Sequence, residues 1–105
     1  MIAREHFDAA TERFIDQPGV VAGRLMSSQG LKVKGKIFAI LVDDRLVVKL
    51  PRPRVVELVE AGTARPFETA PGRVMKEWAT FGTDDVAAWT DLVDESYAYV
   101  TSLIR

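Results

Sequence analysis

Cysteine is absent from the 105 residues, and histidine occurs only once, as His6. Without cysteine the chain has no disulfides, no thiolate metal sites and no cysteine nucleophiles. No apolar run approaches membrane-spanning length, and the opening stretch MIAREHFDAATERF carries charges where a signal peptide needs an apolar segment. We therefore expect a cytoplasmic protein with no membrane segment.

The usual patterns of catalytic and metal sites are also missing. A single histidine excludes a His-Glu-x-x-His zinc motif, so we interpret His6 as a solvated helix residue. The segment 27–30 lacks the glycine run and lysine of a phosphate loop. The acids Asp8, Glu12 and Asp16 lie four residues apart, as a solvated helix stripe does more often than a cation site. No serine has a nucleophile-elbow context; the four serines are Ser27, Ser28, Ser96 and Ser102. The sequence predicts no enzyme, cofactor or metal.

The composition is that of an ordinary globular domain, with 48% hydrophobic and 28% charged residues. We expect one domain over residues 1–105. The net charge of −1 hides a segregation, because residues 24–76 hold eleven Lys or Arg against five acids. The flanking segments 1–23 and 77–105 are acidic. Such a separation can steer an anionic partner, or it can be two solvated faces.

Residues 30–50, GLKVKGKIFAILVDDRLVVKL, predict three consecutive strands. Residues 37–42 are apolar on both faces, as in a central strand. The flanking pieces 31–34 and 45–50 alternate between apolar and charged residues, as in strands with one wetter face. Turns at Lys34-Gly35 and at Asp43-Asp44 make these strands antiparallel.

The remaining chain divides into helices, strands and loops around this sheet. Apolar spacing predicts helices over 2–17, over 53–60 with Gly62 as its stop, and from Thr83 to the end, with the Thr83 hydroxyl as a cap. Strands are expected over 20–26 and 74–81, a turn over 27–30 and a loop over 63–73. The predicted fold is a two-layer α+β domain with an antiparallel sheet of about five strands and three helices, in the order α-β(3-4)-α-β(1-2)-α.

Three segments in this order resemble the TfoX N-terminal domain family, also called TfoX/Sxy-like. They are GLKVKGKIFA at 30–39, DRLVVKL at 44–50 and GRVMKEW at 72–78, with Pro66-Phe67 where the family often has the same pair. The chain departs at 25–27, Leu-Met-Ser, where relatives often have Met-Phe-Gly. The resemblance implies a YgaC/TfoX-N-like two-layer α+β fold and offers no catalytic residues. Named members regulate transcription linked to natural competence and carry a second domain, and residues 1–105 resemble only the first.

The wetter face of the sheet is the candidate binding face. By strand alternation Lys32, Lys34, Arg45 and Lys49 share one side, and Lys76 and Trp78 join them if the later strand aligns. Arg73 extends this basic set. Three interpretations stay open: a solvated face with Trp78 in the core, a protein or homodimer contact centred on Val47 and Trp78, or a nucleic-acid surface.

The functional expectation follows from these absences and from the candidate face. We expect a non-enzymatic domain that acts as a protein-interaction or accessory regulatory module, with a homodimer or another protein as partner. The alternative is weak electrostatic binding of nucleic acid through the basic face. No helix-turn-helix or RNA-recognition signature supports tight, sequence-specific binding.

Overall fold

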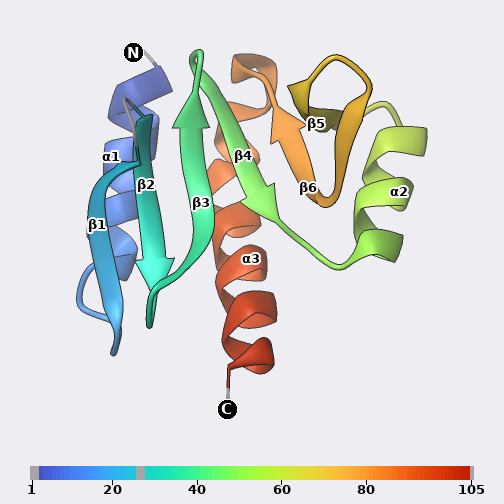
Figure 1. Ribbon diagram of the computed structural model, residues 1–105. Helices are drawn as coiled ribbons and strands as arrows, with labels where there is room; N and C mark the ends of the chain where they lie inside the picture. Colours follow the sequence, from blue (N-terminus) through green and yellow to red (C-terminus); the bar gives the residue numbers. More distant parts are fainter. Residues whose placement is uncertain (1–2, 26–27, 105) are drawn as a thin grey trace.

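The computed structural model describes residues 3–25 and 28–104 and has a helical layer against one antiparallel sheet (Figure 1). The strand order is β1-β2-β3-β4-β6-β5, and every neighbouring pair is antiparallel. The predicted α+β class is confirmed. Among the described residues the sheet has six strands rather than about five.

The elements follow the expected order along the chain. The helices are α1 (Ala3–Phe14), α2 (Arg52–Glu60) and α3 (Trp89–Leu103), and a 3-10 helix, η1 (Thr83–Ala88), precedes α3. The strands are β1 (Val20–Leu25), β2 (Ser28–Val33), β3 (Lys36–Val42), β4 (Arg45–Lys49), β5 (Arg65–Ala70) and β6 (Arg73–Phe81).

Tight turns join the three central strands, as predicted. Lys34 and Gly35 lie between β2 and β3 with φ of 49° and 82°, and Asp43 and Asp44 lie between β3 and β4 with φ of 49° and 62°. Two successive positive φ values mark hairpin turns whose twist matches that of the strands. Asp tolerates this conformation better than most residues other than glycine, so the Asp-Asp turn forms without a glycine.

Three parts of the sequence-based assignment are wrong. The expected loop over 63–73 contains β5. Pro66 and the register shifts beside it obscure the alternation of this strand. Of the expected turn over 27–30, Ser28, Gln29 and Gly30 belong to β2, and residue 27 lies outside the described residues. Thr83 does not cap the last helix: Gly82 is the N-cap of η1, and no side-chain hydrogen bond closes it.

The core lies between the helices and one face of the sheet. Helix α1 buries the predicted stripe of Ala3, Phe7, Ala10 and Phe14. The rings of Phe14 on α1 and Phe38 on β3 have centroids 6.3 Å apart. Tyr97 on α3 lies 5.6 Å from the first ring and 5.5 Å from the second. Aromatic pairs at these separations are favourable, so one cluster joins both helices to the sheet.

A bulge at the centre of the sheet gives α3 its attachment point. The register between β2 and β3 shifts between Leu31 and Lys32, which leaves Phe38 with no partner residue on β2. The Ser96 hydroxyl donates a hydrogen bond of 2.6 Å to the Phe38 carbonyl. Ser96 is a fully buried polar residue in an otherwise apolar core. This bond satisfies a backbone group that the bulge takes out of the ladder.

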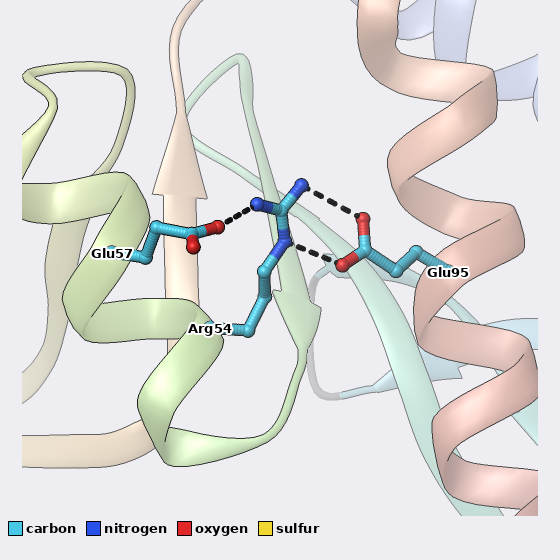
Figure 2. Close-up of polar contacts among 3 residues, drawn as sticks. All are labelled: Arg54, Glu57 and Glu95. Carbon is cyan, nitrogen blue, oxygen red and sulfur yellow. Dashed lines mark hydrogen bonds and ion pairs between the residues drawn. The ribbon is translucent and has the colours of Figure 1, made fainter.

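Helix α2 is tied to α3 by one arginine (Figure 2). Arg54 donates from Nε to Glu95 Oε1 at 2.6 Å and from Nη2 to Glu95 Oε2 at 3.3 Å, and it also pairs with Glu57 one turn along α2. The hydrogen bond to Glu95, followed by that to Glu57, raises the pKa of Arg54. A bidentate contact fixes orientation as well as distance. Buried residues of all three helices join one core cluster with the sheet, so the helices lie on the same side of it.

We expect Ser96→Ala to lower the free energy of unfolding by about 1 to 3 kcal/mol, because it leaves the Phe38 carbonyl buried without a donor. Ser102 is the matched control, since its hydroxyl donates to the Tyr99 carbonyl at the same 2.6 Å but at an exposed position of the same helix. Ser102→Ala should change stability by less than about 0.5 kcal/mol. Urea unfolding of both variants measures the difference, and equal losses would contradict this account of the bulge.

Candidate binding face

The register of the strands assigns each side chain to one of two faces, because directly opposed residues point to the same side. The row Leu31, Ala39, Val48 and Ala79 crosses four strands and is buried under the helices. The next row crosses five strands and points to the other side: Gly30, Ile40, Val47, Thr80 and Arg65. In Figure 1 the helices α1 and α3 lie behind the sheet, and this second side faces the viewer.

We call this second side the open face. Besides the row above, register and alternation place on it the partners Lys32 and Ile37, Val42 and Arg45, and Lys49 and Trp78. Val21 on β1 also lies there, opposite Lys32, and is 61% exposed. The open face therefore combines aliphatic side chains, one tryptophan and four cations.

The apolar surface of the open face comes from β3 rather than from Val47. Val47 is fully buried although it lies outside the helix-facing core, so its neighbours on the open face cover it. Ile37, Ile40 and Val42 are each half-buried and supply the accessible aliphatic area. Val47 is therefore not the centre of a contact surface, which corrects that part of the sequence-based hypothesis.

Trp78 is half-buried at one end of the open face and is not a core residue. The Lys49 ammonium lies 6.0 Å from the centroid of its ring and 3.8 Å from Glu77. Tyr99 on α3 donates a hydrogen bond of 2.6 Å to Glu77, and this bond, followed by burial, raises the pKa of the Tyr99 phenol. Lys49 is thus held over Trp78 and partly neutralised.

The other three cations of the open face have no carboxylate partner. Within residues 3–25 and 28–104, no ion pair includes Lys32, Arg45 or Arg65. Lys32 and Arg45 are half-buried, so their stems cover part of the sheet. Cations without an ion-pair partner, lying beside apolar surface, are the main electrostatic feature of the open face.

The structure separates three predicted residues from the open face. Lys34 lies in the turn after β2, so strand alternation does not reach it, and its backbone N–H donates to the Gly19 carbonyl. Lys76 lines a groove with α2, and no register partner places it on the open face. Arg73 begins β6 opposite Ala70, at the far end of the β5–β6 hairpin. The open face retains Lys32, Arg45, Lys49 and Trp78 from the predicted set.

Two hollows border the open face. One, of about 360 Å³, joins Arg45, Arg65 and Thr80 to three acids, Asp43, Asp44 and Asp84, so its charges are close to balanced.

The other hollow, of about 490 Å³, lies at the Trp78 end. It is lined there by Ile37, Lys49 and Trp78 and by Leu103 and Ile104 at the end of α3. Leu103 is 54% exposed. This second hollow, the Trp78 hollow, could accept one apolar side chain next to two lysines, Lys49 and Lys36.

Arg65 and the aliphatic residues of β3 are parts of the face that strand alternation did not reveal. Arg65 was hidden because β5 was predicted as loop. The residues of β3 are apolar on both sides, so their pattern does not say which ones face outward, and the bulge at Phe38 then changes the alternation. The sequence signal that could have identified the outward-facing residues of β3 is the charged residues opposite them, Lys32 on β2 and Arg45 on β4.

No protein-family model, curated protein or solved structure matches the chain. In the part of the chain that the structure describes, no group of three or more acids and histidines is placed to hold a metal ion. No helix in this part is long and apolar enough to cross a membrane.

We expect iodide to quench the fluorescence of Trp78 more strongly than caesium does, because the surrounding cations attract the anion. Trp89 is only 1% exposed, and its fluorescence is the quencher-resistant signal that remains in the Trp78→Phe variant. Lys49→Gln should reduce the iodide effect, whereas Arg4→Gln, an equal change of charge on exposed α1, should not. Equal quenching by both ions would contradict the electrostatic description of the face.

Proposed function

We propose that this domain is a non-enzymatic protein-interaction module whose open face binds an acidic segment of a partner protein. The supporting observation is a pair of cations without ion-pair partners, Lys32 on β2 and Arg45 on β4, on either side of the half-buried aliphatic residues of β3, with Arg65 further along the face on β5. A partner carrying carboxylates around an apolar anchor would complement both features. The Trp78 hollow gives such an anchor a place next to Lys49.

Charge argues for this partner over a second copy stacked on the same face. Two open faces packed against each other would bring two sets of Lys and Arg together. The residues that the strand register places on this face include no Asp or Glu to offset them. Like charges in a desolvated contact are costly and select against such a pair. The face-to-face homodimer is therefore the weaker form of the protein-interaction hypothesis.

Nucleic acid is the second candidate, since Lys32, Arg45 and Arg65 could contact phosphates. Two features make it the lesser one. Lys49 lies over the ring of Trp78, the tryptophan that a base would stack on. The accessible centre of the face is aliphatic, and isoleucine and valine offer bases neither stacking nor hydrogen bonds.

The resemblance to the TfoX N-terminal domain family is compatible with this proposal. It implies an accessory role in regulation, and such a role requires contact with another protein or with nucleic acid. Membership of that family and a regulatory role remain proposals of the same kind as the binding itself.

Selection from a phage-displayed peptide library tests the proposal, with Trp78 fluorescence as the reporter of binding. We expect enriched peptides to carry Asp or Glu around an aliphatic or aromatic residue. The double variant Lys32→Glu with Arg45→Glu should weaken their binding by about tenfold or more. Binding should also weaken as salt is raised.

The matched control reverses two cations away from the open face, Arg4 on α1 and Arg52 on α2, and should bind normally. Loss of binding in both double variants would mean that the net charge of the domain, and not the open face, determines binding. If no acidic peptide is enriched and labelled single-stranded DNA binds in a salt-dependent way through Lys32 and Arg45, the nucleic-acid function replaces this one.

A further inference from the structure

The two edges of the sheet are built differently. The β5 edge carries Pro66, two charged residues and two register irregularities, all of which hinder pairing with another strand. The β1 edge has an unbroken register of six pairs with β2 and no proline, and Arg24 is its one charged residue. Val21, Ala22 and Gly23 are all exposed, so nothing in the described chain covers them. In the described chain the β5 edge is therefore the better protected of the two against strand addition.

The backbone groups that β1 presents outward can be assigned. Lys34 N–H donates to the Gly19 carbonyl at 2.9 Å, so this opposed pair is hydrogen-bonded. Pairs alternate along an antiparallel ladder, and so Val21 and Gly23 bond to β2 while Ala22 points its N–H and C=O away from it. The Val20 N–H instead donates to the Gln17 carbonyl.

We propose that the β1 edge pairs antiparallel with β1 of a second copy of this chain, making one continuous sheet across a two-fold axis. Antiparallel pairing of a strand with itself is self-complementary, because each bond is repeated by symmetry. With Gly23 opposite Gly23, the outward groups of Ala22 meet those of residue 24 in the partner. Arg24, the one charged residue of β1, then lies opposite Ala22 and not opposite its own copy.

A second copy fits this edge better than an acidic segment does. Four cations of the sheet lie on the open face, whereas the β1 edge carries a single arginine, Arg24, that could attract an acidic chain. The two-fold axis stands perpendicular to the joined sheet, so both open faces lie on the same side. The dimer therefore leaves both open faces accessible and extends them into one surface.

The expected dimer is weak. A single strand pair buries well under the roughly 1,200 Å² of a standard stable interface, so the contact is transient. Sedimentation analysis from about 10 μM to about 1 mM should show a monomer at the low end and a growing dimer fraction at the high end. A monomer throughout this range overturns the proposal, even where an added peptide binds the same edge.

Ala22→Pro is the decisive variant, because it removes the outward N–H and leaves the bonds of Val21 and Gly23 to β2. We expect it to abolish the dimer, while Ala22→Val, which keeps the N–H, retains it. A dimer that persists in Ala22→Pro overturns the proposal. Trp78→Ala should not affect the dimer, so failure of the edge contact and failure of the open-face proposal are distinguishable.

Amide hydrogen exchange in the unchanged chain gives a readout that requires no variant. The Ala22 N–H should exchange rapidly in dilute solution and become protected as the chain is concentrated. The neighbouring Gly23 N–H should be protected at both concentrations, because β2 accepts it. Concentration-independent exchange of Ala22 overturns the proposal whether or not Ala22→Pro folds.

Discussion

The hydrogen bond from Ser96 to the Phe38 carbonyl is the constraint on which the arrangement of layers depends. The bulge in β3 removes one carbonyl from the ladder at the middle of the sheet, where no water can reach it. Only a donor from the helical layer can satisfy that carbonyl, and Ser96 is the buried polar residue of that layer. The bond consequently positions α3 along the strand, and the rings of Phe14, Phe38 and Tyr97 position α1 around it.

The same bulge determines what the open face offers. Without it, strict alternation would not place both Ile37 and Ile40 on one side of β3. The extra residue lets Phe38 and Ala39 point into the core while Ile37 and Ile40 remain outside. A feature that anchors the helices therefore also produces the aliphatic centre of the candidate binding face. Core packing and surface chemistry are coupled through one irregularity of backbone.

Sequence reasoning reached the parts of this fold that have strong local signals. The apolar run of β3, the turn at Asp43-Asp44 and the stripe on α1 each carry a period or a turn pattern, and the structure contains all three. It missed β5, because Pro66 and the register shifts disrupt the alternation there. It also placed Lys34 on the face by alternation, although the Lys34-Gly35 turn that it predicted takes this residue out of the strand. The bulge depends on contacts between residues 38 and 96, which no local pattern encodes.

The segregation of charge along the sequence becomes a segregation by layer in the structure. Four strand cations of residues 24–76 point to the open face, Lys32, Arg45, Lys49 and Arg65, whereas α1 and α3 together carry six acids against two arginines. Register makes this separation inseparable from folding: a shift of one residue in β4 would expose Leu46 and Val48 and bury Arg45 and Lys49. The core therefore enforces the exposure of the cations. Whatever binds the open face therefore meets these side chains in positions that the strand register fixes.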